Sequence, residues 1–466
     1  MNRRKFIKSS GTAVAAAMTV SPVSAQSAKR PNIIVIVTDQ QSATMMSSAG
    51  NSYLKTPNMD RLAASGVSFE RAYCSAPVCV PSRFSLMTGR MPSEIGMRSN
   101  ELDGVIDIPK HILDQGLGQR FKRAGYDAAY GGKEHLPKMD VNDLGFDYIC
   151  EDERDELAAT CADYIKEERD KPFLLISSLI NPHDICYMAI RDFAESEFSK
   201  YLIKAGVVEV KTLDRALKTP DAVSREEFLR DYCPPLPANF EPQQDEPDAL
   251  RDLIALRPFR MKARKQWTDE RWRMHRWAYH RLTEMVDTQV GIILDALDES
   301  GKAEETVVIF TSDHGDMDAS HRMEHKTAFY DEASRIPLIV SQPGKTPSGI
   351  VDRSNLVSNG LDLYPTLCDY AGIELPHDLH GMSFRPLAEG LLPAHSRKAI
   401  PVENEIGRMI VSAGHKYAQH DGGENSEQLY DLAADPGEMR NAMKDNGKKD
   451  VVQDHRTMFV ELFGGK

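Results

Sequence analysis

A short segment beginning at Cys79 combines a thiol with residue types that bind oxyanions. It reads Cys-Val-Pro-Ser-Arg-Phe-Ser-Leu-Met-Thr-Gly-Arg. Pro81 suits the first turn of a helix, where its missing N–H costs nothing, and Gly89 suits the end of that helix. A helix N-terminus favours anions, and the forked, permanently charged guanidinium of Arg83 suits a tetrahedral oxyanion. The segment therefore predicts a place that holds a sulfate or phosphate group near Cys79.

Polar residues follow four apolar segments that are typical of buried strands. The segments are residues 32–38, 127–131, 173–180 and 307–311. Close after them come Asp39 and Gln40, Lys133 and His135, Asn181, His183 and Asp184, and finally Asp313, His314 and Asp316. Ligands of an open α/β sheet collect beyond the carboxyl ends of its strands, so we expect these residues to meet. Asp, Asn and Ser are also common in turns, but turns alone do not explain four such ends.

Strands and helices alternate along most of the chain. Residues 336–341 predict a further strand, and a long helix is expected at about 271–300. This alternation predicts an α/β fold with a large mixed, mostly parallel central sheet flanked by helices. Short strands with tight turns then predict a smaller C-terminal antiparallel-sheet subdomain at residues 376–466. Residues 31–375 are expected to form the main α/β domain.

Residues 190–270 break this alternation. They are charged and contain clustered prolines. We interpret them as an insertion, part helix and part loop, over the active edge of the sheet, where long loops often set specificity. A surface elaboration without contact to substrate is the alternative, and the sequence does not choose between the two.

The segment at Cys79 resembles the signature of the formylglycine-dependent (type I) sulfatases, which belong to the alkaline-phosphatase-like superfamily. It matches cysteine, any residue, proline, serine and arginine, and then the Leu-x-Thr-Gly-Arg tail. Residues 325–338 resemble the family's Gly-Lys…Tyr-Glu-Glu…Arg-Val-Pro-Leu block, with His325 in place of glycine. Residues 427–441 resemble its C-terminal block, so the resemblance covers residues 31–445. It implies hydrolysis of sulfate monoesters and, by analogy, a sulfated carbohydrate as substrate.

The resemblance also implies a modified nucleophile. In this family the cysteine is oxidised to formylglycine, an aldehyde whose hydrate is the nucleophile, so a formylglycine-generating maturation enzyme is the expected partner of Cys79. Arg83, Lys133 and Lys326 are expected to stabilise charge on the sulfuryl oxygens. An isolated lysine is usually a solvated surface charge, but Lys326 lies within the 325–338 block.

Two histidines are the candidates for proton transfer. His183 is assigned as the general acid that protonates the leaving alcohol, and His135 as the base for the hydrated aldehyde. The sequence gives motifs and not distances, so the two roles could be exchanged. His321 and His325 are expected to be structural or to contact substrate. Arg98 and Asn100, shortly after the signature, are expected either at the surface or near a sugar hydroxyl or carboxylate.

A divalent cation is the expected cofactor. Asp39, Gln40, Asp313 and His314 offer oxygen ligands and one imidazole, which suits Ca²⁺ or Mg²⁺, and Cys79 in its modified form completes the expected set. The family usually has a second aspartate where Gln40 stands. The same Asp-Gln pair occurs in its choline-sulfatase and phosphonate-monoester-hydrolase branch, so a metal remains expected.

Charge and chain ends limit where the protein acts. The 466 residues carry a formal net charge of −13, which argues against a nucleic-acid partner. Residues 1–25 resemble a twin-arginine export signal, with Asn-Arg-Arg-Lys-Phe-Ile-Lys at 2–8, a small apolar run at 11–20 and Val-Ser-Ala at 23–25. No segment is long and apolar enough to span a bilayer. We therefore expect an exported protein, periplasmic or extracellular, without stable membrane insertion.

The seven cysteines do not have zinc-binding spacing. An oxidising compartment permits disulfides, so Cys150 and Cys161 could pair or could be two unrelated thiols. Two alternative functions also stay open. The first is hydrolysis of phosphonate or phosphate esters by the same superfamily. The second is a non-catalytic protein that binds sulfated glycans and keeps Cys79 as a thiol.

Overall fold

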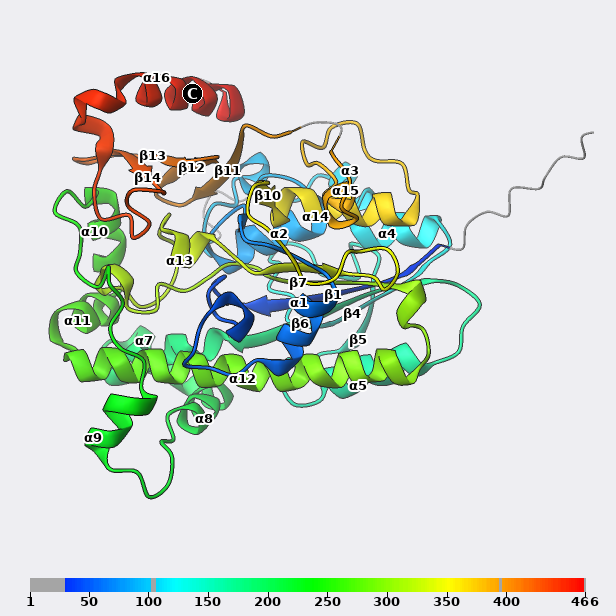
Figure 1. Cartoon of the computed structure of the whole chain (residues 1–466), viewed down its shortest axis with the longest axis horizontal. Coiled ribbons are helices and arrows are strands. Elements are labelled where there is room, and N and C mark those ends of the chain that lie inside the picture. The colour runs from blue at the N-terminus through cyan, green and yellow to red at the C-terminus, as the bar shows by residue number, and fades with distance from the viewer. Residues whose placement is uncertain (1–29, 102–105, 394–395, 465–466) are drawn as a thin grey trace, which may run out of the picture.

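A mixed central sheet with helices on both faces dominates the fold (Figure 1). The computed structural model describes residues 30–101, 106–393 and 396–464, so the expected signal at 1–25 lies outside the described residues. Among the described residues the sheet has eight strands in the order β5-β4-β6-β1-β7-β8-β2-β9. The bounds are β1 (Asn32–Asp39), β2 (Val67–Phe69), β4 (Asp127–Gly132), β5 (Asp147–Cys150), β6 (Phe173–Pro182), β7 (Thr306–Ser312), β8 (Leu338–Ser341) and β9 (Ile350–Asp352).

The strands that precede the candidate site residues are mutually parallel. β1 pairs with β6 on one side and β7 on the other, and β4 pairs with β6, all in parallel register. Their carboxyl ends therefore lie at one edge of the sheet, as the sequence predicts. β8 runs antiparallel to β7, and β2 runs antiparallel to β8, so the sheet is mixed.

Both faces of the central strands are buried, which explains their continuous apolar sequence. Ile33, Val35 and Val37 of β1 join a core with helices α2 (Cys79–Thr88), α4 (Leu117–Arg123) and α14 (Asn359–Ala371). The alternate residues Ile34 and Ile36 face a second core with α1 (Pro57–Ser65), α5 (Leu157–Lys166) and α12 (Asp269–Glu299). The sheet is thus held between two helical layers, and this rigid layer positions the loops at its edge.

The region predicted as an insertion is mostly helical. Its helices and their neighbours are α6 (Tyr187–Asp192), α7 (Glu197–Ala205), α8 (Val207–Ala216), α9 (Arg225–Glu227), α10 (Asp248–Ala255) and α11 (Pro258–Gln266). Helices α6, α8 and α11 pack on the first half of α12 through an aromatic core that includes Trp267, Trp272 and Trp277. Helix α10 packs instead in a separate cluster with Tyr330 and Tyr430. Figure 1 shows α7, α10 and α11 at the end of the molecule toward which β1 runs. They therefore lie on the same side of the sheet as the candidate site residues.

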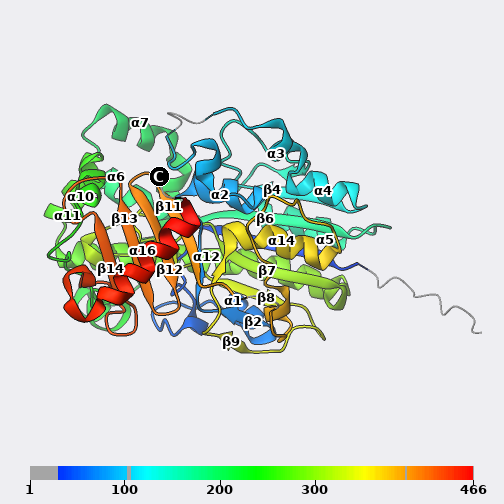
Figure 2. The same ribbon diagram turned by 90° about the horizontal axis from the view of Figure 1, so that it is seen from above.

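The C-terminal part forms its own antiparallel sheet, as the sequence predicts. Its strands are β11 (Ala399–Asn404), β12 (Gly407–Ser412), β13 (His415–His420) and β14 (Glu427–Asp431). Helix α16 (Lys449–Phe463) lies across one face (Figure 2) and packs there on Ile410, Tyr417 and Leu429. The opposite face packs on Phe329. The remaining elements are β3 (Ala72–Tyr73), β10 (Val357–Ser358), α3 (Lys110–Asp114), α13 (Asp331–Ser334) and α15 (Arg385–Ala388).

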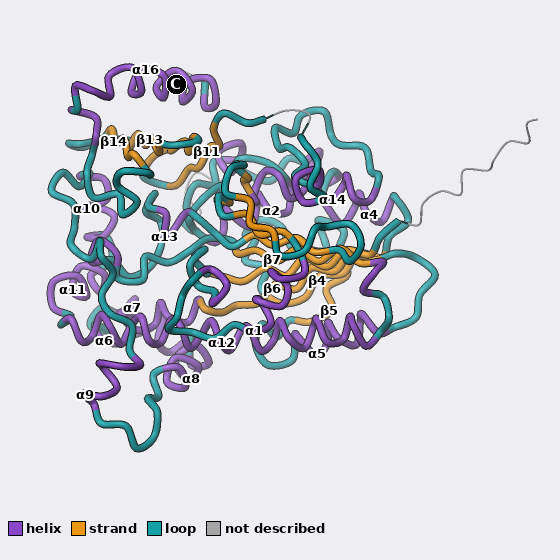
Figure 3. The backbone as a smooth tube through the Cα atoms, viewed as in Figure 1, coloured by secondary structure: helices purple, strands orange, loops and turns teal. Residues whose placement is uncertain are grey.

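A buried lysine ties the C-terminal sheet to the main domain. Lys416 of β13 is fully buried, and its Nζ lies 2.6 Å from Asp331 Oδ1 and 2.7 Å from Glu438 Oε1. It also donates a hydrogen bond to the backbone oxygen of Phe329 over 3.0 Å. Asp331 begins α13, five residues after Lys326. The C-terminal sheet therefore supports the loop that carries Lys326. Figure 3 shows strands β11, β13 and β14 above α13.

All seven cysteines lie in the described part of the chain, and none of them there forms a disulfide, so Cys150 and Cys161 are separate thiols. Cys150 is half-buried at the end of β5, and Cys161 is buried within α5. None of the helices formed by residues 30–101, 106–393 and 396–464 has the length and apolarity needed to cross a membrane.

Candidate active site

Helix α2 places Cys79 at the centre of the site. Cys79 is its first residue, all ten residues of the helix are buried, and Gly89 ends it with a left-handed φ of 69°. The backbone N–H of Val80 donates to the side-chain oxygen of Asn100 over 3.1 Å, so one of the free donors at the helix start is satisfied. Pro81 lies in the first turn, as expected. Asn100, a candidate for substrate contact, thus holds the start of the helix.

Arg83 binds protein groups through each of its three nitrogens. Nε donates to Asp313 Oδ2 and Nη2 donates to Asp39 Oδ2, both over 2.9 Å. Nη1 donates to the backbone oxygen of Lys133 over 2.9 Å and to Ser178 Oγ over 2.7 Å. Because these donors are occupied, the guanidinium orients the two carboxylates. The expectation that Arg83 contacts sulfuryl oxygens stays a prediction beside these contacts.

Two lysines bring positive charge to Cys79. Lys326 Nζ lies 2.9 Å from Cys79 Sγ and 2.7 Å from Gln40 Oε1, and it is almost fully buried. Lys133 Nζ lies 2.6 Å from Asp39 Oδ2. Burial lowers the pKa of Lys326. The acidic groups around it, above all Cys79 and Cys186, raise this pKa by more than burial lowers it, so the ammonium stays charged. The structure thus brings both predicted lysines to the thiol and its carboxylate neighbour.

Four predicted metal ligands form one buried cluster. Potential ligand atoms of Asp39, Cys79, Asp313 and His314 all lie within 4.8 Å of one another. His314 Nε2 is 3.2 Å from Cys79 Sγ, while its Nδ1 lies 2.9 Å from the backbone oxygen of Gly315, which fixes the ring. A histidine held in this way presents its other nitrogen toward a metal.

The charges in this cluster fit a divalent cation. Burial and the charge of Asp39 raise the pKa of Asp313 to about 6. Burial also raises the pKa of Asp39, but Lys133, His183 and Arg83 outweigh it and hold that pKa well below its usual range. Two nearby carboxylates repel each other when both are ionised, and a cation between them stabilises both negative charges. The donor set of oxygens with one imidazole therefore fits Ca²⁺ or Mg²⁺.

Gln40 lies at the same place with an unusual backbone. Its φ is 69°, in the left-handed region, and its backbone N–H donates to Asp313 Oδ1 over 3.1 Å. Its Oε1 accepts hydrogen bonds from Lys326 and from Cys186, the latter over 3.1 Å. Its Nε2 donates to Asp316 Oδ2 over 2.6 Å, which fixes the direction of the amide. The side-chain oxygen of Gln40 thus points toward the side where Cys79 and Lys326 meet.

The two candidate proton-transfer histidines differ in burial. His183 directly follows β6, is largely buried, and its Nδ1 has no hydrogen-bond partner among the described residues. Burial and then the charges of Lys133 and Lys326 lower its pKa well below the usual value, so the ring is neutral before substrate binds. His135 is exposed and has a left-handed φ of 47°. His183 is therefore part of the charged cluster, and His135 is open to solvent.

The other residues considered from the sequence have mainly structural contacts. His321 is buried and stacks on Tyr330 with ring centroids 3.8 Å apart. Arg98 donates to the backbone oxygen of Gly407 over 2.8 Å and pairs with Asp421 at 3.1 Å, so it links the signature segment to the C-terminal sheet. His325 has a φ of 102°, a conformation that glycine adopts most easily. This explains why the resembling block has glycine there.

Several residues have supporting contacts that the sequence did not assign to them. Asp316 is buried and holds the amide of Gln40, and burial raises its pKa to about 7. Its signal was its position in the Ser-Asp-His-Gly-Asp run after β7. Ser82 Oγ donates to the backbone oxygen of Asp313 over 2.5 Å. Tyr279 of α12 donates to the backbone oxygen of Gln40 over 2.6 Å. Nothing in the local sequence around Tyr279 indicated this contact.

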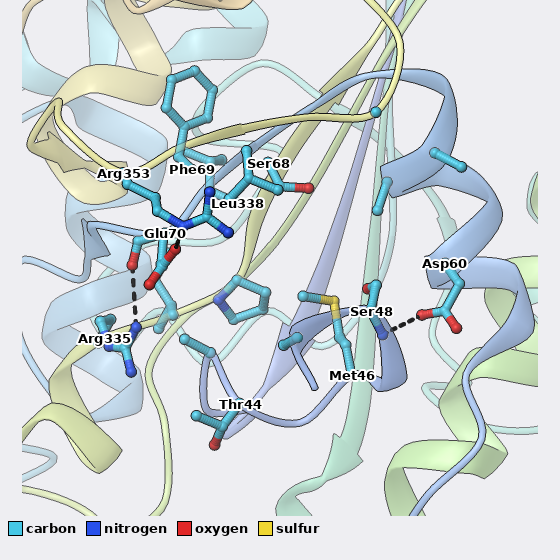
Figure 4. A pocket seen from close by; sticks show the side chains of 18 residues that line it. Thr44, Met46, Ser48, Asp60, Ser68, Phe69, Glu70, Arg335, Leu338 and Arg353 are labelled. Atoms are coloured by element: carbon cyan, nitrogen blue, oxygen red, sulfur yellow. Dashed lines mark hydrogen bonds and ion pairs between the residues drawn. The ribbon is translucent and has the colours of Figure 1, made fainter. Parts of the chain in front are cut away.

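A separate cavity lies on another part of the molecule (Figure 4). It has a volume of about 500 Å³ and is formed by the segment after β1, helix α1 and the edge of the sheet around β2 and β9. Glu70 and Arg353 form an ion pair across it at 2.9 Å. It contains none of the predicted site residues, so its size carries no argument about the chemistry at Cys79.

Comparison with known proteins agrees with this geometry. Residues 31–373 match the sulfatase family, and residues 319–463 match the family described as N-sulphoglucosamine sulphohydrolase, C-terminal. A Δ4,5-hexuronate-2-O-sulfatase of Bacteroides thetaiotaomicron is 30% identical over 93% of this chain and 89% of its own length. An N-acetylglucosamine-6-O-sulfatase of the same organism is 27% identical, over 89% of this chain and 82% of its own.

Solved structures show the same architecture. A 2-O GAG sulfatase is similar with a TM-score of 0.76 and 28% identity, over 93% of this chain and 92% of that one. The phosphonate monoester hydrolase of Agrobacterium radiobacter, at 22% identity and a TM-score of 0.70, shares the fold over 93% of this chain and 95% of its own. The matching family and these relatives, together with the fold, define a sulfuric ester hydrolase with an alkaline-phosphatase-like fold. The chain belongs to the sulfatase family.

Proposed function

We propose that this protein hydrolyses sulfate monoesters of a carbohydrate through a formylglycine formed from Cys79. The observation that carries the proposal is the position of Cys79 at the start of α2, 2.9 Å from Lys326 Nζ and beside Asp39, Asp313 and His314. A residue placed there faces cations and helix N–H groups, which favours a negatively charged ester. The family membership supports the modification, because the sequence around Cys79 matches every fixed position of its signature.

A sulfated saccharide is the substrate class that the relatives favour. The names of two curated relatives specify a hexuronate 2-O-sulfate and an N-acetylglucosamine 6-O-sulfate. A structural neighbour, 24% identical, was solved with D-glucosamine-2-N,6-O-disulfate as its substrate. These substrates are small sulfated sugars, so we extend that class to this chain.

A divalent cation, Ca²⁺ or Mg²⁺, would be held by Asp39, Gln40, Asp313 and His314, next to the modified Cys79. When bound, it supplies Lewis-acid stabilisation of negative charge on the oxygens around it. Arg83 holds the two carboxylates in place for it.

The remaining residues act directly on the substrate. Lys133 and Lys326 are proposed to stabilise charge that develops on the sulfuryl oxygens, because both ammonium groups are already fixed by buried acceptors. His183 is proposed to donate a proton to the leaving alcohol. The negative charge of a bound sulfate ester offsets the positive charges of Lys133 and Lys326, which keep the His183 ring neutral. Substrate binding therefore raises the pKa of His183. His135 is proposed as the base that accepts a proton from the hydrated aldehyde.

Several aspects of the protein's maturation and organisation belong to the same proposal. A formylglycine-generating enzyme would act on Cys79, and the twin-arginine-like residues 1–25 would direct the protein to the periplasm or outside the cell. Residues 31–375 are proposed as the catalytic domain and 376–466 as the C-terminal subdomain. The helices within 190–270 are proposed to shape the substrate entrance, because they lie at the carboxyl edge of the sheet.

Release of inorganic sulfate from defined sulfated saccharides tests the proposal. The protein is produced together with a formylglycine-generating enzyme, and conversion of Cys79 is checked by the mass of its peptide. Cys79→Ala is the inactive control. A strong preference for aryl phosphates or phosphonates over matched aryl sulfates would favour the alternative hydrolase, which the Asp39–Gln40 pair also allows. Binding without turnover by protein that keeps the Cys79 thiol would favour a glycan-binding protein.

A further inference from the structure

Helix α11 is fixed beside the loop that carries Lys326. Arg257, the residue before its first turn, forms an ion pair with Glu101, next to the residue that caps the start of α2. At the other end of α11, Arg264 pairs with Glu246 at 2.6 Å and donates to the backbone oxygen of His321 over 3.3 Å. Both ends of the helix are thus connected to segments that surround the active site.

Arg260 lies between these two anchors but has no anionic partner among the described residues. It is partly buried, and its Nε is fully buried without a hydrogen-bond partner. Within residues 30–101, 106–393 and 396–464, its side chain forms no hydrogen bond and no ion pair. Arginine carries five donors and keeps its charge at any physiological pH. A partly desolvated guanidinium of this kind is stabilised when an anion binds to it.

Arg260 influences the pKa of a residue that lies next to the active site. Burial and then Arg260, ahead of Lys326 and His183, lower the pKa of His325. Burial lowers the pKa of Arg260, while Glu324 and then Cys186, whose Sγ contacts Gln40 Oε1, raise it. Arg260 is therefore near both the residue before Lys326 and the residue that supports Gln40, at the border of the proposed reaction site.

The nearby acids do not neutralise Arg260. Burial raises the pKa of Glu324 to about 8, so this side chain is mainly protonated at neutral pH. One oxygen of Glu324 has no hydrogen-bond partner among the described residues, and the other lies 3.3 Å from His325 Nδ1. The exposed Glu405 interacts with Arg260 through space but forms no ion pair with it. A positive charge therefore remains available at this border.

We propose that Arg260 binds a second oxyanion of the substrate, a carboxylate or a further sulfate on the saccharide whose ester group meets Cys79. This inference rests on the proposed function and names a narrower substrate class, saccharides that carry at least two anionic groups. A guanidinium binds either oxyanion through two parallel N–H donors. Arg260 is thus a specificity-determining residue, separate from the groups that hold the reacting sulfate.

Sulfate release from matched substrates tests the role of Arg260. Arg260→Ala and Arg260→Lys are compared with Lys265→Ala, which removes an exposed charge from the same helix. The substrates are a neutral monosulfated sugar, a sulfated uronate, a disulfated sugar and an aryl sulfate. We expect Arg260→Ala to lower kcat/KM for one or both dianionic sugars by roughly 30- to 1000-fold. The two monoanionic substrates should change less than about threefold, and Arg260→Lys should recover part of the loss.

The pattern of loss identifies the bound group. A loss on the uronate assigns a carboxylate, and a loss on the disulfated sugar assigns a second sulfate. Equal losses on all four substrates, or no loss on either dianionic sugar, would overturn the proposal. A melting temperature that matches the wild-type protein shows that Arg260→Ala is folded.

Direct binding separates this inference from the proposed function. If the mature wild-type protein releases sulfate from none of the four substrates, the proposed function fails. Calorimetric titration of Cys79→Ala and of Cys79→Ala/Arg260→Ala with the same saccharides then still tests Arg260. Weaker binding of the dianionic sugars alone in the double variant supports the inference, and equal binding by both proteins contradicts it.

Discussion

The ammonium group of Lys326 donates a hydrogen bond to Cys79 Sγ over 2.9 Å. The same group donates to Gln40 Oε1 over 2.7 Å, so it is fixed between Cys79 and a proposed metal ligand. The C-terminal sheet holds the segment after Lys326, because Lys416 binds Asp331 of α13 and the backbone oxygen of Phe329. A lysine held in this way stabilises developing charge without reorganising during the reaction.

Replacing Lys326 is therefore expected to reduce turnover far more than binding. Lys326→Ala should lower kcat for a sulfated saccharide by about 10²- to 10³-fold, because charge on the sulfuryl oxygens loses a preorganised donor. Lys326→Arg keeps the charge but not the compact ammonium, so we expect an intermediate loss. Steady-state kinetics measure both effects, and the Cys79 peptide mass shows whether maturation is unaffected. Wild-type kcat in a fully converted Lys326→Ala protein would contradict this role.

Removal of divalent metal should abolish sulfate release reversibly. We expect a chelator to inactivate the protein and Ca²⁺ or Mg²⁺ to restore it, since Asp39 and Asp313 share one buried site. Added metal at 100 times its Kd should stabilise the fold by about 2.7 kcal/mol, seen as a rise in Tm. Asp313→Asn should lose most of this rise, whereas Asp163→Asn, at an exposed position on α5, should keep it. An equal rise in both variants would argue against a metal at Asp313.

We expect the position of His183 to depend on a buried ion pair at the next residue in the chain. Asp184 is fully buried, and Arg154 binds it through Nη2 over 2.8 Å and through Nε over 3.3 Å. Arg154→Met leaves this carboxylate without a charged partner, which should cost about 3–5 kcal/mol of stability. It should also lower kcat, because the turn that carries His183 moves.

Thermal unfolding and kinetics of three variants check this prediction. Arg154→Lys keeps one charge and should lose less than Arg154→Met. Adding Asp184→Asn to Arg154→Met removes the unpaired charge and should recover part of the lost stability. If the double variant is no more stable than Arg154→Met, the unpaired carboxylate is not the cause.

The sequence predicts the fold well where local pattern determines it. The β-branched run of β1 and the alternation of strands with helices predict a parallel sheet, and the structure confirms it. The antiparallel direction of β8 could not be predicted, because it depends on how the loop after β7 returns across the sheet. The helices around α11 were only partly expected, since their packing on α12 uses aromatic contacts far apart in sequence.

The candidate site shows the same division. Asp39, Asp313 and His314 were predicted because strand ends meet at one edge of a parallel sheet, and the structure brings them together. The partners of Arg83 could not be predicted, because they lie in or directly after four strands that are distant in sequence. Arg260 gave no signal at all, since an unpaired charge is visible only when its surroundings are known.

The buried carboxyl of Glu324 should make stability depend on pH. Its pKa is about 8 in the folded protein, above the ordinary value of 4.5, because burial disfavours the charged form. The folded state therefore binds more protons than the unfolded state between these values, and stability falls as pH rises from about 4.5 to 8. Glu324→Gln keeps the shape without this ionisation, so its Tm should exceed that of the wild-type protein at pH 8 and approach it near pH 5. At pH 8 the free energies of unfolding of the two proteins should differ by an amount on the order of a few kcal/mol, at about one kcal/mol for each pKa unit.

Glu241→Gln, at an exposed position paired with Arg322, is the matched control and should follow the wild-type pH profile. Parallel profiles for the wild-type protein and Glu324→Gln across this range would show that Glu324 does not take up a proton on folding.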